Sequence, residues 1–141
     1  MSPRPRGPSR TGRLPSDAEL TRYGAQIRRI RTSRAEVDWM QGPGPTDLWI
    51  WYGTDGEVSH VELGFASRIV RLTAGVLATG RSQEAVGSSY AQTDLVELDP
   101  ALDPDTVRAA RCIVDAVPNE VRNGPIIDLV KALSEVTTPN I

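Results

Sequence analysis

The residues of this sequence that could carry chemistry lie on one face of a predicted β-hairpin. β-Forming residues over 48–52 and 58–65 flank an Asp-Gly pair, which is a strong local signal for a hairpin turn. Because side chains alternate along a strand, every second residue shares a face. One face is therefore expected to collect an aromatic floor, an imidazole and a charged pair, from Trp49, Trp51, His60, Glu62 and, on the next strand, Arg71.

The apolar pattern of this hairpin predicts its register. With Asp55 and Gly56 at the turn, the aliphatic positions of both strands fall on one face. A slip of one residue would mix aliphatic and polar side chains, so the pattern favours this register. The expected pairs are Tyr52 with Ser59, Ile50 with Val61, Leu48 with Leu63, Trp51 with His60, and Trp49 with Glu62.

The face that holds the two indoles has two interpretations. On the first, it is a site for a partner protein or a small ligand, in which Glu62 pairs with Arg71 on the neighbouring strand. His60 could then act as a base, since the ordinary pKa of histidine is about 6.5. On the second, the sheet is covered on both sides and the indoles are core. Ser59 points to the opposite face in this register, so no nucleophile is evident and no catalytic residue is assigned.

Sequence motifs for catalysis and metal binding are absent. The chain has no GxxxxGK[ST] phosphate loop, no GxGxxG, no nucleophile elbow and no HExxH. A single histidine, a single cysteine and no Asp-rich loop of calcium spacing leave no metal site to expect. Cys112 is expected to be buried in a helix and inert. We therefore predict neither a cofactor nor a metal ion.

Length and composition predict a single intracellular domain. A chain of 141 residues, of which 39% are hydrophobic, can bury one core without disulfides. One cysteine agrees with a reducing compartment. No stretch is apolar over the roughly 18 residues that span a bilayer, and the N-terminus lacks the pattern of a signal peptide. A cytoplasmic location without a membrane partner is expected.

Charge is distributed unevenly along the chain. Residues 1–34 hold nine arginines against Asp17 and Glu19, a net of +7, so that the remainder carries −9 within a total of −2. Such an arm could contact nucleic acid, although it lacks interleaved aromatic residues for stacking on bases. The arm could equally attract the acidic body or remain solvated. Residues 1–15 are rich in Pro, Arg, Ser and Gly, which predicts a disordered arm that is dispensable for folding.

The remaining elements follow from capping signals and apolar spacing. Ser16 and Glu19 form a capping box that starts a helix over about 17–33, with its apolar stripe at Leu20, Tyr23, Ile27 and Ile30. A short extended segment is expected over 37–40, followed by a Gly-Pro loop over 42–45. Further strands are expected at 68–73 and 76–79, and a polar loop at 81–94.

Two helices are expected in the last third of the chain. Asp103 and Pro104 are a good N-cap and first residue for a helix that ends before Pro118. Another helix begins near Pro125, with Ile126, Ile127, Val130 and Leu133 facing inward. The whole pattern predicts an α+β domain over 16–141, in which one N-terminal and two C-terminal helices pack on a small antiparallel sheet built on the Trp-rich hairpin.

Part of this pattern resembles a group of proteins. The run from Asp47 to Phe65, with Val70 and a later Thr79-Gly80, resembles small uncharacterised bacterial α+β proteins that share a DLxxW motif, an acidic turn, an alternating strand and a TG pair. The resemblance covers about a third of the chain and implies a fold but no activity. Immunity proteins for bacterial toxins are also small, acidic α+β proteins, and they act by binding, which is an analogy of size and charge alone.

These observations favour a non-catalytic protein-binding module, an adaptor or an immunity-type protein. One alternative is a small-molecule-binding protein or an enzyme that uses the face of Trp49, Trp51 and His60. Another is an accessory nucleic-acid-binding protein that uses the arginine-rich arm.

Overall fold

The computed structural model describes residues 14–30, 36–44, 46–82 and 96–137. Within these residues the chain forms one antiparallel sheet and three helices, which confirms the α+β prediction. The strands are β1 (Arg28–Ile30), β2 (Val37–Gln41), β3 (Asp47–Tyr52), β4 (Val58–Phe65), β5 (Arg68–Thr73), β6 (Val76–Ser82) and β7 (Val96–Leu98), and the helices are α2 (Asp17–Ala25), α3 (Pro104–Asp115) and α4 (Gly124–Thr137).

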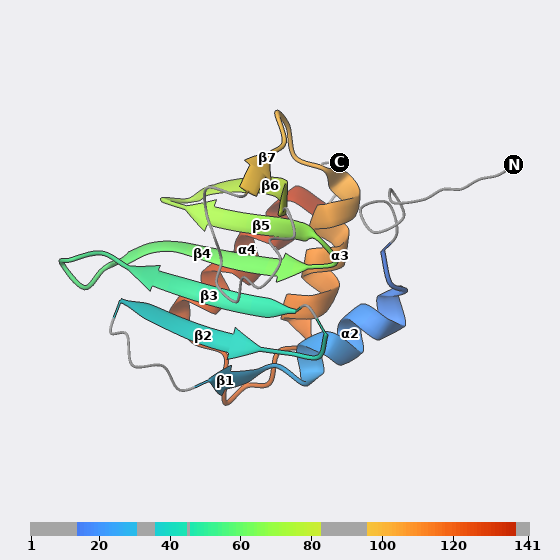
Figure 1. Ribbon diagram of the computed structural model, residues 1–141, viewed down its shortest axis with the longest axis horizontal. Helices are drawn as coiled ribbons and strands as arrows, with labels where there is room; N and C mark the ends of the chain where they lie inside the picture. The colour runs from blue at the N-terminus through green and yellow to red at the C-terminus, as the bar shows by residue number, and fades with distance from the viewer. Residues whose placement is uncertain (1–13, 31–35, 45, 83–95, 138–141) are drawn as a thin grey trace, which may run out of the picture.

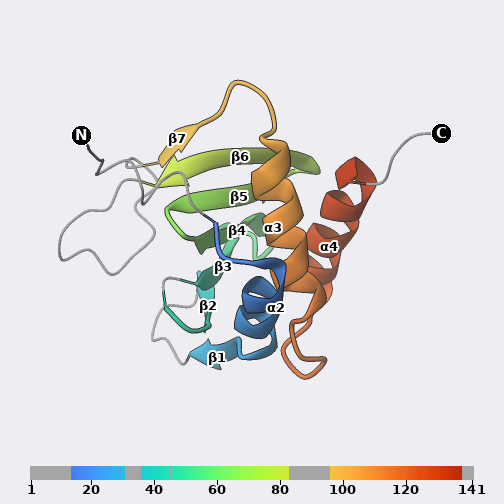
Figure 2. The same ribbon diagram turned by 90° about the vertical axis from the view of Figure 1, so that its right-hand side faces the viewer.

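The sheet is a seven-stranded meander in which each strand pairs with its neighbours in sequence (Figure 1). All three helices lie on one side of it, with α3 and α4 across the sheet and α2 beside α3 (Figure 2). We call the side without helices the outer face. The core lies between sheet and helices and is built from alternate strand positions and one face of each helix: Leu20, Met40, Leu48, Ile50, Val61, Leu63, Val70, Ala110, Ile113, Ile126, Leu129 and Leu133.

The predicted hairpin register is confirmed at four of its pairs: Leu48 with Leu63, Trp49 with Glu62, Ile50 with Val61 and Trp51 with His60. The predicted pairing of Tyr52 with Ser59 is wrong, because the register shifts after Trp51 and places Tyr52 opposite Val58. The cause is a wider turn than two residues. The amide of Gly53 donates to the carbonyl of Glu57 at 2.8 Å, and Gly56 has a positive φ of 82°.

The first helix is shorter than its apolar spacing predicted. The capping box is confirmed, with the Glu19 amide donating to Ser16 Oγ at 3.2 Å and the Ser16 amide to Glu19 Oε1 at 3.4 Å. The helix nevertheless ends at Ala25, and residues 28–30 form β1 instead of continuing it to Ser33. Ile27 is buried in the connection, so this apolar side chain fits the core from a non-helical backbone.

The later elements differ from expectation at several positions. Strand β6 extends to Ser82, beyond its predicted end at 79, and β7 lies in a stretch for which no element was predicted. Ile127 is exposed, and Leu129 takes the expected core position. Cys112 is half-buried, not buried. Residues 1–13 of the predicted arm and 83–94 of the predicted loop lie outside the described residues.

The N-cap of α3 lies in a polar network that ties this helix to the sheet. The Asp103 carboxylate accepts from the Thr106 amide at 3.3 Å and from Arg68 Nη1, on β5, at 2.9 Å. The Asp103 amide donates in turn to Thr79 Oγ1 at 2.9 Å. Arg68 is buried and also donates to Thr106 Oγ1 at 3.0 Å. The hydrogen bonds from Thr106 and the charge of Arg68 lower the pKa of Asp103.

Replacing Asp103 by asparagine is expected to make the free energy of unfolding less dependent on pH in the acid range. The interactions that lower the pKa of Asp103 in the folded state stabilise the protein at pH values above the pKa of this group in the unfolded chain, about 3.9. This stabilisation is lost as the pH falls through the folded-state pKa. Asparagine keeps the cap but removes the anion beside Arg68, at a cost of about 1–2 kcal/mol at neutral pH.

Urea melts at pH 7 and pH 3 measure this difference in stability, which should shrink at the lower pH. Asp105→Asn changes the same charge at an exposed position in the first turn of α3, and is the matched control. An equal loss for the two variants at pH 7 would contradict the role of the network.

None of the helices in the described part of the chain is long and apolar enough to cross a membrane.

Candidate binding face

The five side chains predicted to converge do so on the outer face of the sheet. Strand pairing places Trp51 beside His60, Trp49 beside Glu62, and Glu62 beside Arg71. The outer face therefore brings an aromatic surface and a charged pair together on β3, β4 and β5.

A third indole, which the sequence analysis did not include, extends the aromatic surface. Trp39 on β2 lies opposite Trp49, and their ring centroids are 4.9 Å apart with an interplanar angle of 3°. Trp49 and Trp51 are 6.3 Å apart, and Trp51 and the His60 ring 5.9 Å. We call these four stacked rings the indole ladder. It contains all three tryptophans of the chain.

Burial differs along the ladder. The central Trp49 is 5% exposed, whereas Trp39, Trp51 and His60 are half-buried. Because the rings stack from strand to strand, much of their flat surface is already in contact with another ring. The rings of the half-buried members therefore present mainly their edges to a partner. Trp49 is thus core-like, while its neighbours form an accessible surface.

The charged pair beside the ladder is more buried than a surface ion pair. Arg71 Nε donates to Glu62 Oε1 at 3.0 Å, and Nη2 of the same guanidinium lies 3.0 Å from that oxygen. Glu62 is only 3% exposed, and burial raises its pKa while Arg71 opposes the rise. Both contacts go to Oε1, so Oε2 accepts no hydrogen bond from the described residues.

Asp47 is a second carboxylate of the outer face and was also missed from the sequence. It lies diagonally across from Glu62, since Asp47 pairs with Gly64 and Trp49 with Glu62. The indole Nε1 of Trp39 donates to Asp47 Oδ1 at 2.8 Å. Burial raises the pKa of this carboxyl group, and the hydrogen bond from Trp39 opposes the rise. Its second oxygen, Oδ2, has no hydrogen-bond partner among the described residues.

His60 closes the ladder at its β4 end. Its Nδ1 lies 3.2 Å from Ser59 Oγ. Ser59 was expected on the opposite face of the sheet, yet its hydroxyl is within hydrogen-bond distance of the imidazole. Nε2 is buried and has no hydrogen-bond partner in the described part of the chain. Burial and then the charge of Arg71 lower the pKa of His60, which keeps the ring neutral at pH 7. No acid among the described residues lies on Nε2 to orient the ring, so these residues give the Ser59–His60 pair no third member of a hydrolase triad.

The outer face combines polar side chains with an aromatic surface. No group of His, Cys, Asp or Glu in the described residues could hold a metal ion. Nε2 of His60 is buried without a hydrogen-bond partner among these residues, next to a half-buried aromatic surface. Such groups suit hydrogen bonding and apolar contact with a partner.

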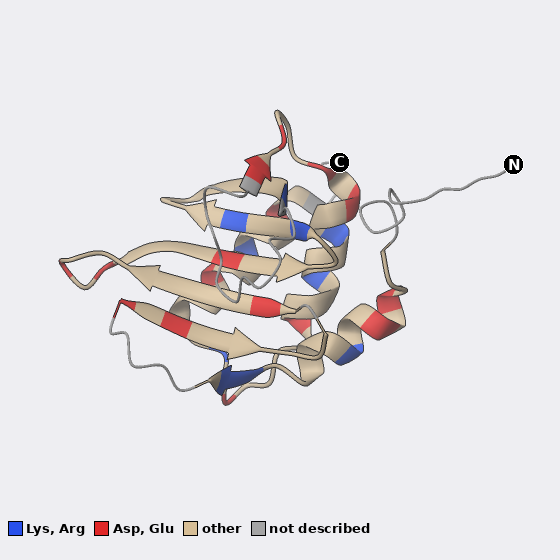
Figure 3. Ribbon diagram, in the orientation of Figure 1, with Lys and Arg blue, Asp and Glu red and all other residues tan. Residues whose placement is uncertain are grey.

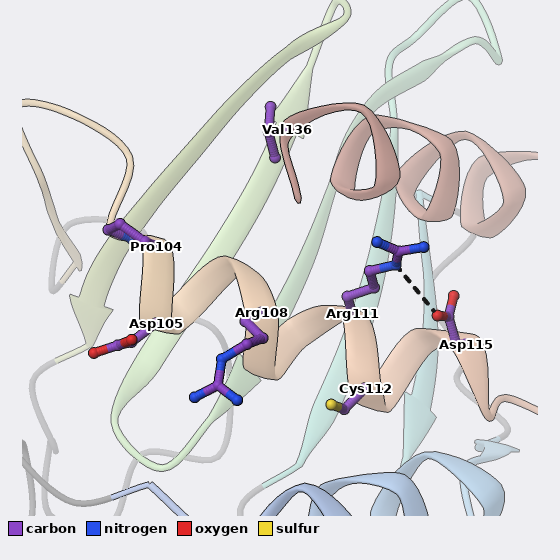
Figure 4. A pocket seen from close by; sticks show the side chains of 7 residues that line it. All are labelled: Pro104, Asp105, Arg108, Arg111, Cys112, Asp115 and Val136. Atoms are coloured by element: carbon purple, nitrogen blue, oxygen red, sulfur yellow. Dashed lines mark ion pairs between the residues drawn. The ribbon is translucent and has the colours of Figure 1, made fainter. Parts of the chain in front are cut away.

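A concave region lies on the helix side, along α3 (Figure 4). It has a volume of about 590 Å³ and is lined by Pro104, Asp105, Arg108, Arg111, Cys112, Asp115 and Val136. Its charges are largely paired within the protein, Arg108 with Asp17 at 3.3 Å and Arg111 with Asp115 at 3.4 Å. Burial, followed by the charge of Asp17, raises the pKa of the Cys112 thiol, which disfavours the nucleophilic thiolate. This groove is a weaker candidate than the outer face.

Comparison of the chain with protein-family models, with curated proteins and with solved structures gives no match.

Proposed function

We propose that this protein is a non-catalytic binding module that uses the outer face to hold another protein. The observation that supports this most is the indole ladder. An antiparallel sheet with helices on one side normally presents polar residues on the other. Here the outward positions of β2 and β3 include Trp39, Trp49 and Trp51. Tryptophan is among the residues most enriched at the energetic centres of protein interfaces.

The stacking favours a protein over a flat small molecule. A planar ligand binds an aromatic floor through the flat surfaces of its rings, and the ladder has used most of those surfaces internally. Accessible ring edges suit a larger, irregular partner surface. The desolvated Glu62–Arg71 pair beside the ladder adds charge specificity.

Capture of partners by full-length protein tests this proposal. Trp51→Ala is expected to weaken partner binding by about 30-fold or more, as the loss of an aromatic anchor worth about 2 kcal/mol would. His60→Gln should weaken the same interaction with little effect on folding. Proteins captured from extracts of the host by wild type are identified, and the affinity of each is then measured against both variants.

Ile127→Ala is the matched control, because Ile127 is a large exposed apolar residue on α4, on the helix side of the sheet. Binding that survives Trp51→Ala but is lost in Ile127→Ala would place the interface on the helix layer. That result would contradict the proposal.

A further inference from the structure

We propose that the protein partner docks at one end of the outer face, beside the turn between β3 and β4, and that the surface it brings there is basic and apolar. The side chains that it contacts are Trp51, His60, Thr73 and Val76, which we call the turn-end row. The inference rests on the proposed function, since it names the footprint on the same face and the chemistry of the partner.

Strand pairing aligns the turn-end row across four neighbouring strands. Trp51 on β3 pairs with His60 on β4. His60 pairs in turn with Thr73 on β5, and Thr73 with Val76 on β6. Paired residues share a face and neighbouring strands are about 4.8 Å apart, so the row spans about 15 Å. It lies at the end of the sheet where the β3–β4 and β5–β6 turns lie (Figure 1).

The turn-end row is more accessible than the centre of the outer face. In the next row along the strands, Trp49 is 5% exposed and Glu62 is 3% exposed. In the turn-end row the two rings are half-buried and Thr73 is exposed. Val76 is 67% exposed, the largest value for a large hydrophobic side chain in the described part of the chain. Its neighbour Leu77 packs partly against the core, so the core does not require the side chain of Val76.

The turn beside this row is acidic. Asp55 and Glu57 lie between β3 and β4 and are exposed. Figure 3 shows acidic positions at this turn, while the turn between β5 and β6 is uncharged. Neither carboxylate has an ion pair among the described residues, whereas Arg71 on the same face is paired with Glu62. Two negative charges next to the row are therefore left for a partner to neutralise.

Arginine on the partner matches both features. Its guanidinium group bonds carboxylates through a planar fork of N–H donors, while its aliphatic stem packs on apolar surface. A partner that presents arginines among aliphatic side chains would therefore contact the turn and the row together. Complementary charge also speeds the encounter and makes it sensitive to salt. The same turn repels a polyanion such as nucleic acid.

His60 supplies a specific measurement, because it is the only histidine of the chain and lies in the row. Its ring signals are followed by NMR at constant pH while the full-length protein is titrated with a hexapeptide of alternating leucine and arginine. They are expected to shift in a saturable way with a Kd on the order of 1 mM, as for a short peptide that covers part of an interface. A hexapeptide of alternating leucine and glutamate should cause no shift. No shift with the arginine peptide, or equal shifts with both, would overturn the proposal.

The double variant Asp55→Asn with Glu57→Gln removes the charge of the turn. Asparagine can still accept the hydrogen bond that Asp55 Oδ1 accepts from the Glu57 amide at 3.0 Å, so the turn is kept. Binding of the arginine peptide is expected to weaken about fivefold and to lose most of its dependence on salt. The matched control, Asp128→Asn with Glu135→Gln, removes the same charge from exposed positions on α4. Equal weakening by the two double variants would show that only net charge matters, which contradicts the assigned site.

Val76→Ala tests the apolar part of the row. Binding of the arginine peptide is expected to weaken about threefold through the loss of apolar contact, with little change in folding at so exposed a position. Ile127→Ala, an exposed apolar position on α4, is the matched control and should leave the Kd unchanged. An unchanged Kd for Val76→Ala would place the contact outside the row and refute the inference.

Failure of the inference is distinguishable from failure of the proposed function. The affinity of each captured partner is measured for the double variant of the turn beside Trp51→Ala. A partner that requires Trp51 but binds the turn variant as tightly as wild type would refute the inference alone. A partner that binds Trp51→Ala as tightly as wild type would refute the proposed function.

Discussion

Alanine at position 24 is expected to lower the thermal midpoint of the protein by about 10 °C, through a loss of about 3 kcal/mol in stability. Gly24 lies near the end of α2, where this helix crosses α3. A Cβ atom at this position would lie 1.9 Å from the carbonyl oxygen of Ile113 and 2.7 Å from its carbonyl carbon. The obstacle is backbone, so no change of rotamer relieves it, and the two helices must move apart.

Gly124→Ala is the control for this prediction. Gly124 begins α4, and a Cβ atom there meets nothing within 4 Å. Because alanine has a higher helix propensity than glycine, this variant should be neutral or slightly stabilised. Thermal melts of the two variants beside wild type make the comparison. A Gly24→Ala protein as stable as wild type would show that α2 does not rest closely on α3.

The length of α2 was mispredicted, and its close crossing with α3 at Gly24 was not predicted either. Spacing from Leu20 to Ile27 and Ile30 fits a helix, and local patterning alone could not show that the helix stops early. The close approach to Ile113 is a contact between segments nearly ninety positions apart in the sequence, so it leaves no local signal beyond the glycine itself. Ile27 reaches the core after the helix has ended.

The hairpin was predictable because its signals are local and agree with one another. The Asp-Gly turn, the β-forming residues and the alternation of apolar and polar side chains all specify one register, and the structure has it at the central pairs. The predicted register fails at Tyr52 for a local reason as well. The turn between Gly53 and Glu57 is wider than two residues, so Tyr52 does not lie opposite Ser59.

The candidate site was only partly predictable, for a different reason. Trp39 and Asp47 join it through the pairing of β2 with β3, which matches Trp39 to Trp49. An extended segment was predicted at 37–40, but its pairing with the hairpin was not. The sequence did carry a signal for this pairing, because Val37, Trp39 and Gln41 alternate with the inward Met40. Applied to an assumed meander, it would have added Trp39 to the aromatic face.

Replacing Trp49 by alanine is expected to cost about 3–4 kcal/mol in folding, and about twice or more the cost of Trp39→Ala or Trp51→Ala. The central indole is 5% exposed and loses ring contacts on two sides, whereas each outer indole is half-buried. An outer indole should therefore cost about 1–2 kcal/mol. Trp49→Phe keeps an aromatic ring between its neighbours and should recover most of the loss.

Denaturant melts followed by circular dichroism compare the four variants, since fluorescence changes with each tryptophan removed. The difference in stability cost between the central and the outer indoles distinguishes a binding surface from a core. A surface for a partner must leave its outer rings accessible in the free protein, while a central ring fixes their spacing and orientation. If Trp39→Ala and Trp51→Ala each cost as much as Trp49→Ala, the three indoles are an ordinary core on both sides of the sheet. The outer face would then have no aromatic surface left to offer a partner.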